Sequence, residues 1–133
     1  MISMKAYRIT PPLIFQLDAG QIFVFGSNQA GRHMGGAARV AMERFGAVWG
    51  VGEGLQGQSY AIPTMEGLEN TRAAVRRFID YARNHPELTF LVTPIGCGIA
   101  GYTPSDIAPM FHSALPLANV WLPESFWEVL KNN

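Results

Sequence analysis

Short apolar runs alternate along this chain with longer stretches in which apolar residues recur at helical spacing. A short apolar run bounded by glycine or proline predicts a buried strand, and recurrence at helical spacing predicts an amphipathic helix. The runs that predict strands are residues 22–25, 59–62, 88–95 and 119–122, with residues 6–10 as a further candidate for an edge strand. The stretches that predict helices are residues 36–45, 71–84, 104–115 and 123–130.

This regular alternation predicts an α/β fold with a mainly parallel central sheet, right-handed crossovers and helices on both faces. Asn70 is the expected N-cap of the second helix, and Thr103 is expected to cap the third with Pro104 at its first position. The helix positions expected to face the core are Ala37, Val40, Ala41, Phe45, Ala74, Phe78, Ile79 and Ala82. Residues 47–58 are too rich in glycine for long regular structure, and their length favours a functional loop.

Composition and charge limit the classes of function. A chain of 133 residues with 48% hydrophobic residues fits one domain, residues 1–133. Ten basic and ten acidic residues give a net charge of zero, which favours neither nucleic acid nor a membrane surface as partner. One cysteine and no long apolar segment predict a cytoplasmic protein without disulfides. No cysteine, histidine or acidic cluster has metal-ligand spacing, so neither a metal nor a cofactor is expected.

The first glycine-rich turn follows the strand at 22–25 directly. Gly26, Ser27 and Asn28 break the strand, and Gly31, Gly35 and Gly36 lead into the next helix. A strand, a glycine-rich turn and a helix N-terminus in this order make an anion site, because unpaired backbone N–H groups converge there. Alternatively, the glycines only let the helix pack closely on its strand.

A second glycine-rich turn follows the strand at 88–95. Its residues are Gly96, Cys97, Gly98, Ile99, Ala100, Gly101 and Tyr102. Both turns should face one crevice, since the carboxyl ends of parallel strands meet at the same edge of the sheet. Two amide-rich loops around one crevice suit a diphosphate. The chain lacks GxxxxGK[ST] and a properly placed GxGxxG, which argues against a P-loop hydrolase and a standard dinucleotide fold.

The segments FVFGSN, MGGAARVAMERFG, SYAIPT, LTFLVTPIGCGIAGYTPSDIAPMF and ANVWLPESF, in this order, resemble a macro domain. More closely, they resemble a compact group of macro-like proteins found in bacteria and phages. The resemblance covers residues 21–123 and implies a three-layer α/β/α domain. It also implies binding of ADP-ribose, and some members of the family hydrolyse ADP-ribosyl groups.

The resemblance also implies roles for individual residues. Asn28 would orient the distal ribose, and Gly35 and Gly36 would match the catalytic glycine loop. The second turn would wrap the diphosphate, with Tyr102 near the distal ribose. The residues expected to bind ligand are Gly26, Ser27, Asn28, Gly31, Arg32, Gly35, Gly36, Gly96, Cys97, Gly98, Ile99, Ala100, Gly101 and Tyr102.

The chain departs from the family pattern at several points. The usual Asn-Ala-Ala-Asn is replaced by Phe-Gly-Ser-Asn at residues 25–28. Arg32 and His33 are absent from the common pattern. No counterpart is found for the acidic residue that reads the adenine amino group, since Asp18 lies too close to the strand.

Asn28, His33 and Glu53 are the candidate catalytic residues. His33 is the first choice for a general acid or base, and Glu53, with Gln56 and Gln58, is expected to enter the crevice and position a water.

Each candidate has an alternative role. Asn28 would only close the turn, and His33 would be an exposed loop residue. Arg32 would clamp a phosphate or pair with a surface carboxylate, and Cys97 would be a nucleophile or a small buried thiol.

Three hypotheses follow. The first is a macro-like domain that binds ADP-ribose or a related nucleoside-diphosphate ribose, and that hydrolyses ADP-ribosyl linkages if it is an enzyme. The second is a reader that binds without hydrolysis. The third is a structural bacterial or phage protein without ligand, whose crevice is blocked by side chains such as Met34, Tyr102 or Trp49.

Overall fold

The computed structural model describes residues 8–131, which form an α/β fold around a five-stranded mixed sheet. The strands are β1 (Gln21–Ser27), β2 (Gly54–Gln56), β3 (Ser59–Pro63), β4 (Thr89–Val92) and β5 (Val120–Trp121). Their order across the sheet is β2-β3-β1-β4-β5. Only the β2–β3 pair is antiparallel, so the mainly parallel sheet expected from the alternation is confirmed.

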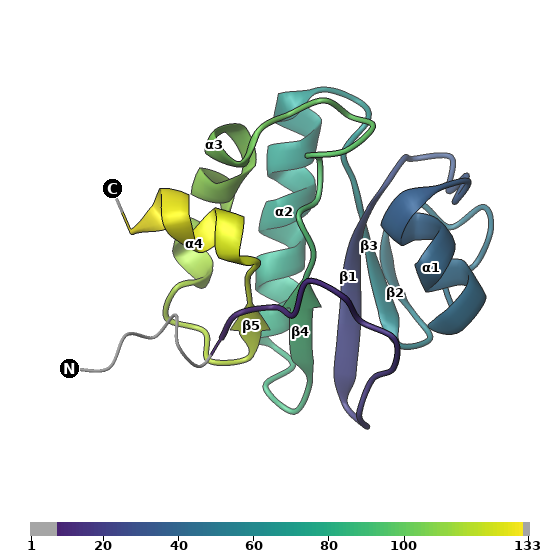
Figure 1. Cartoon of the computed structure of the whole chain (residues 1–133), viewed down its shortest axis with the longest axis horizontal. Helices are drawn as coiled ribbons and strands as arrows, with labels where there is room; N and C mark the ends of the chain where they lie inside the picture. The colour runs from purple at the N-terminus through teal and green to yellow at the C-terminus, as the bar shows by residue number, and fades with distance from the viewer. Residues whose placement is uncertain (1–7, 132–133) are drawn as a thin grey trace.

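Helices lie on either side of β1 in Figure 1. They are α1 (Gly36–Arg44), α2 (Leu68–Arg83), α3 (Pro104–Ile107) and α4 (Glu124–Leu130), with a 3₁₀ helix, η2 (Ala108–Ala114), after α3. In the part of the chain that the structure describes, no helix combines the length and the apolar character needed to cross a membrane.

Strand β1 divides the core into two clusters. Ile22 and Val24 pack into the larger cluster with α2, η2 and α4, whereas Phe23 and Phe25 pack into the smaller cluster with α1. Alternate side chains of a strand point to opposite faces, which explains why residues 22–25 of β1 are all apolar. The inward positions expected in α2 are all buried. In α1 the buried face is Ala38 and Ala41 rather than Ala37 and Val40, which are only partly buried.

Two predicted helices differ from those observed. Helix α2 begins three residues earlier than expected, with Gly67 as its N-cap at a φ of 97°. Asn70 therefore lies inside the first turn, where its amide donates to the Glu66 carbonyl at 2.7 Å. The helix expected over 104–115 is α only as far as Ile107, although Thr103 and Asp106 form the expected cap. Pro109 explains why the α-helix ends here, because it has no N–H and its ring clashes with the carbonyl four residues earlier in α-helical geometry.

The predicted strands were wrong in extent, and one observed strand was not predicted. Strand β4 ends at Val92, before Pro94, and β2 was not predicted because its glycines indicate a turn. Of the candidate edge strand at 6–10, residues 6 and 7 lie outside the described residues, and Ile9 forms an isolated bridge with Leu122.

The N-terminal segment is fixed to the sheet by a buried arginine. Arg8 is 3% exposed, and its guanidinium donates to the carbonyls of Val120 at 2.9 Å and Leu115 at 2.9 Å. The Arg8 carbonyl accepts the indole N–H of Trp127 at 2.9 Å. Burial lowers the pKa of Arg8, but several carbonyl oxygens compensate its charge in part. These hydrogen bonds therefore fix the first described residues of the chain beside β5, an edge strand of the sheet.

The buried phenol of Tyr60 gives the fold a defined sensitivity to alkali. Burial, and secondarily the charge of Glu53, raises the pKa of Tyr60 from 10.0 to about 12. The unfolded chain therefore releases this proton at lower pH than the folded one, so Tyr60 stabilises the fold below pH 10 and loses this contribution between pH 10 and 12.

We expect the wild-type free energy of unfolding to fall by about 2–3 kcal/mol more than that of Tyr60→Phe between these pH values. Urea denaturation of both proteins at several pH values measures the difference. Parallel pH dependence in the two proteins would contradict the assignment.

Candidate functional site

A groove of about 510 Å³ opens at the carboxyl ends of β1, β3 and β4. Both glycine-rich turns line it, as the parallel strands predict. From the first turn come Gly26, Ser27, Asn28, Arg32, Gly35 and Gly36, and from the second come Gly96, Gly98, Ile99 and Ala100. The groove is also lined by Met34, which the sequence analysis named as a side chain that would block the crevice. Further lining residues had no expected role at the site: Ala37, Ala38, Thr64, Met65, Thr93, Pro94 and Ile95. The strand predicted at 59–62 was the signal that could have placed Thr64 and Met65 at this edge, because they follow β3 directly.

Asn28 closes the first turn with its side chain. Its Oδ1 accepts the Arg32 N–H at 2.9 Å, and its Nδ2 donates to the Arg32 carbonyl at 3.1 Å. The Asn28 carbonyl also accepts the Gly31 N–H at 2.9 Å. These bonds match the turn-closing alternative. Asn28 still borders the groove, but both polar atoms of its amide already have backbone partners.

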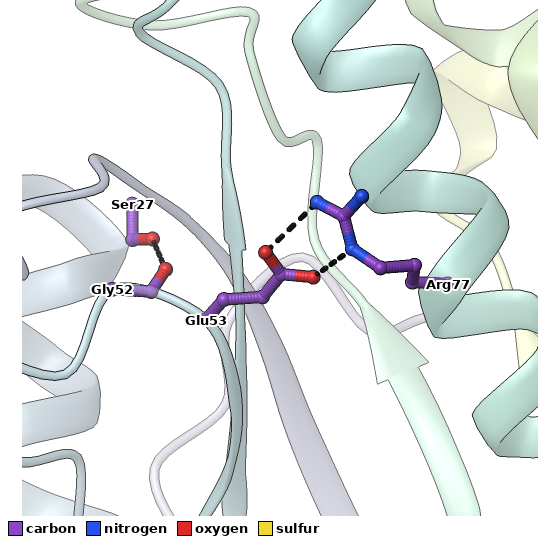
Figure 2. A network of polar contacts seen from close by, with 4 residues as sticks. All are labelled: Ser27, Gly52, Glu53 and Arg77. Carbon is purple, nitrogen blue, oxygen red and sulfur yellow. Dashed lines mark hydrogen bonds and ion pairs between the residues drawn. The ribbon is translucent and has the colours of Figure 1, made fainter.

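The glycine-rich loop at 47–58 packs directly behind this turn. The Gly50 N–H donates to the Gly31 carbonyl at 2.9 Å, and the Ser27 hydroxyl donates to the Gly52 carbonyl (Figure 2). A Cβ on Gly52 would overlap the carbonyl oxygens of Asn28 and Gln29. The backbones of the two loops therefore meet without intervening side chains, and the Ser27 hydroxyl is directed toward this contact.

The side chain of Gln56 stabilises the conformation of this loop through hydrogen bonds to its backbone. This side chain is 7% exposed, and its Oε1 accepts the Val48 N–H at 2.7 Å. Its Nε2 donates to the carbonyls of Val51 at 3.1 Å and Gly54 at 3.3 Å. Gln58 instead donates to the carbonyls of Asp18 and Gln21. Neither glutamine enters the groove, which corrects the expectation.

Glu53 also points away from the groove. Figure 2 shows its carboxylate extending toward Arg77 on α2, with oxygen–nitrogen distances of 2.6 and 2.9 Å. The hydrogen bond to Glu53 raises the pKa of Arg77. Glu53 was expected to position a water in the crevice. The structure instead places it in a bidentate ion pair that ties the loop to α2.

His33 is fully buried, which contradicts the alternative of an exposed loop residue. Its ring packs edge-on against Phe25 with 5.2 Å between centroids, and its Nε2 lies 3.0 Å from the Val48 carbonyl. The His33 Nδ1 has no hydrogen-bond partner among the described residues. His33 does not line the groove; it supports the first turn from the side of α1.

Several residues of the two turns lie outside the groove lining. Gly31, Cys97, Gly101 and Tyr102 were expected to bind ligand and do not line it. Cys97 and Tyr102 are half-buried against the larger core cluster. Burial, with a smaller contribution from Asp106, raises the pKa of the Cys97 thiol, which is the reverse of what a thiolate nucleophile needs. The small-thiol alternative therefore agrees with the structure.

Gly35 and Gly98 differ from the other glycines. Ten of the fourteen glycines have a positive φ, and Gly26 and Gly52 would bring a Cβ against neighbouring atoms. Gly35 and Gly98 have neither restriction, since nothing lies within 4 Å of a Cβ built on them. Both line the groove, from opposite turns. Backbone conformation and internal packing therefore do not explain these two glycines.

The groove favours anions locally. The N-terminus of α1 has no side-chain cap and no acidic residue in its first turn, and Gly36, Ala37 and Ala38 line the groove there. Their N–H groups precede the first intrahelical hydrogen bonds and carry the positive end of the helix dipole. Arg32 is exposed on the same groove. No aspartate, glutamate, histidine or cysteine is among the described residues that line it.

A second chamber of about 720 Å³ adjoins the groove and shares Ala37, Thr93 and Pro94 with it. Its remaining walls come from residues 9–15, from β1, from α1 and from the start of α4: Ile9, Thr10, Pro11, Pro12, Leu13, Ile14, Phe15, Phe23, Val40, Glu43, Arg44, Pro123, Glu124 and Ser125. Thr10 is 4% exposed, and its hydroxyl has no hydrogen-bond partner within residues 8–131. The sequence pattern gave no sign of this chamber.

The contact between the two loops can be tested at Gly52. Gly52→Ala should lower the free energy of unfolding by about 2 kcal/mol or more, because the new methyl group meets two carbonyl oxygens that cannot move independently. Chemical denaturation measures the change, with Gly98→Ala as the matched control, which should stay within about 0.5 kcal/mol of wild type. Equal stability of the two variants would show that the loops do not pack as described.

Three or more potential metal-ligating side chains gather nowhere within the described residues. No protein-family model, curated protein or solved structure matches this chain. Only their geometry therefore bears on the roles of the groove and the second chamber.

Proposed function

We propose that this protein is a macro-like three-layer α/β/α domain that binds ADP-ribose or a related nucleoside-diphosphate ribose. The observation that carries the proposal is the pair Gly35 and Gly98. Both line the groove, and neither is required by backbone conformation or by packing within the chain. Glycine at such positions is expected where a ligand approaches the backbone closely.

The diphosphate is assigned to the groove. The N–H groups at the start of α1 lie on one side, and the backbone of the second glycine turn lies on the other. Backbone amides at a helix N-terminus bind phosphate oxygens without a lysine. Among the described residues of the lining, Arg32 is the one with a charged side chain, and a guanidinium binds phosphate in a bidentate manner. These local groups would attract an anion although the protein as a whole has no net charge.

The base of the ligand is assigned to the second chamber. The chamber begins where the groove ends, at the shared residues Ala37, Thr93 and Pro94. Its walls are mainly apolar, and its size is that of a pocket for a small organic molecule. The unpartnered Thr10 hydroxyl is a hydrogen-bonding group for the edge of a base, because a buried hydroxyl is costly when it has no partner.

The structural-protein hypothesis has less support. Tyr102 and Trp49 do not line the groove. Met34 does, but its side chain is 71% exposed and leaves the groove open. A groove of this volume between two glycine turns is what a ligand-binding role requires.

Binding without hydrolysis is the form of the proposal that we favour. Asn28 holds the Arg32 backbone, Glu53 is paired with Arg77, and His33 is buried behind the turn. The described lining of the groove therefore offers no side chain for general acid–base catalysis. The protein would act as a reader of the bound group.

The binding proposal predicts a direct effect of filling the two glycine positions. Gly35→Ala and Gly98→Ala should each weaken ADP-ribose binding about tenfold or more while the free energy of unfolding stays near that of wild type. Calorimetric titration measures the dissociation constants, and Leu55→Ala, at an exposed position outside both cavities, is the control. Absence of heat with millimolar ADP-ribose and folded wild-type protein would refute the binding proposal.

The reader form makes a separate prediction. Wild-type protein incubated with ADP-ribosylated protein and with ADP-ribose esters should release no ADP-ribose above the uncatalysed rate, because no proton-transferring group borders the groove. Chromatography of the released nucleotide measures this rate. Turnover that Gly98→Ala abolishes would establish an enzyme and refute the reader form while leaving the binding site in place.

A further inference from the structure

Residues 11–17 form an irregular segment, which we call the strap, and residues 11–15 of it line the second chamber. Both of its ends are fixed. Thr10 donates its N–H to the Leu122 carbonyl at 2.9 Å, and the Asp18 carbonyl accepts the side-chain amide of Gln58 at 3.1 Å. Pro11 and Pro12 begin the strap and have no N–H groups. The strap therefore leaves the edge of the sheet immediately after Thr10 instead of continuing as a strand.

Between these ends the strap is only weakly attached. Within the described residues, its backbone receives one hydrogen bond, from the Arg44 guanidinium to the Phe15 carbonyl at 3.5 Å. That distance is at the limit for a hydrogen bond. Ile14 and Leu17 pack against the smaller core cluster and hold the strap by side-chain contacts alone. A segment with so few backbone bonds can adjust at low cost.

The outward side chains of the strap are large, apolar and exposed. Leu13 is 72% exposed and Phe15 is 68% exposed, yet both also line the second chamber. Ile14 and Leu17 are the partly buried residues of the strap, and they pack against the smaller core cluster. Leu13 and Phe15 therefore stand at the mouth of a mainly apolar chamber with most of their surface in water.

We propose that the strap is a cover for the second chamber and that Phe15 stacks on the aromatic base of the ligand. This inference rests on the proposed function, since it assigns a base to the chamber. A flat ring entering the chamber buries apolar surface on Phe15 and Leu13 that is otherwise hydrated, which favours closure of the strap. Thr10, at the fixed end of the strap, then supplies the polar contact at the edge of the base. Phe15 and Leu13 thereby select for ligands that carry an aromatic base.

Calorimetric titration of four proteins with ADP-ribose tests the cover. Phe15→Ala should raise the dissociation constant about tenfold or more, because stacking of a base on an aromatic ring is lost. Phe15→Tyr should retain wild-type affinity, since it keeps a ring of the same shape. Trp49→Ala is the matched control, because Trp49 is an exposed aromatic residue outside both cavities, and it should leave the affinity unchanged. Phe15 is exposed, so its loss should not unfold the protein.

The variant Gly98→Ala distinguishes a failure of the cover proposal from a failure of the proposed function. If Gly98→Ala weakens binding and Phe15→Ala does not, the groove binds ligand and the cover is wrong. If Phe15→Ala and Trp49→Ala weaken binding equally, the effect is not specific to the chamber and the cover is again wrong. If wild-type protein binds no ADP-ribose, the proposed function fails and the cover fails with it.

Hydrogen exchange provides a second readout that affinity alone does not give. Amides at residues 13–17 should exchange rapidly in the free protein and at least about fivefold more slowly when ADP-ribose is bound, because closure shields them from water. Amides in the loop at 48–51 should be unaffected. Unchanged exchange in the strap at saturating ligand would overturn the proposal.

Discussion

The site depends on the close approach of two backbone segments, the turn after β1 and the glycine-rich loop that precedes β2. Gly31 and Gly52 make the approach possible, since a Cβ on either would overlap the opposite backbone. Hydrogen bonds from Gly50 to Gly31 and from Ser27 to Gly52 then join the two segments. Backbone groups that meet this closely have few alternative positions, because interiors are packed to high density. The wall of the groove is therefore rigid although it consists of loops.

The contacts that hold the turn and the loop together occupy the polar side chains that the sequence offers for catalysis. Asn28 binds the backbone of Arg32, Gln56 holds the loop, and Glu53 joins it to α2 through Arg77. Each of these groups reduces the number of unpaired polar atoms in a loop-rich region, where backbone groups have few regular partners. What remains exposed to the groove is backbone, small side chains and the large apolar side chains of Met34, Met65 and Ile99, with Arg32 as the charged group of the described lining. Such a lining suits recognition of an anionic ligand better than proton transfer.

The elements set by local pattern were predictable, and those set by distant contacts were not. Strand β1 and the buried face of α2 follow from runs and periods that a few neighbouring residues determine. The meeting of the two glycine turns also followed, because strand order along the chain fixes the edge at which each strand ends. The burial of His33 did not follow, because it depends on Val48 and Phe25, which lie far from it along the chain or on another element. Loop residues have no period that would indicate which way a side chain turns.

The glycines illustrate why composition alone could not separate structure from function. Gly31 and Gly52 are required by neighbouring backbone, and Gly36 and Gly96 by a positive φ. Gly35 and Gly98 meet neither condition and lie on opposite sides of one groove. The sequence alone does not distinguish these six glycines. Close packing of a helix on its strand would explain each of them equally well. The structure separates them. A Cβ on Gly35 or Gly98 would have empty space around it, and both positions line the groove, so no contact among the described residues requires glycine there. A ligand whose phosphates approach the backbone would supply that reason for both positions at once.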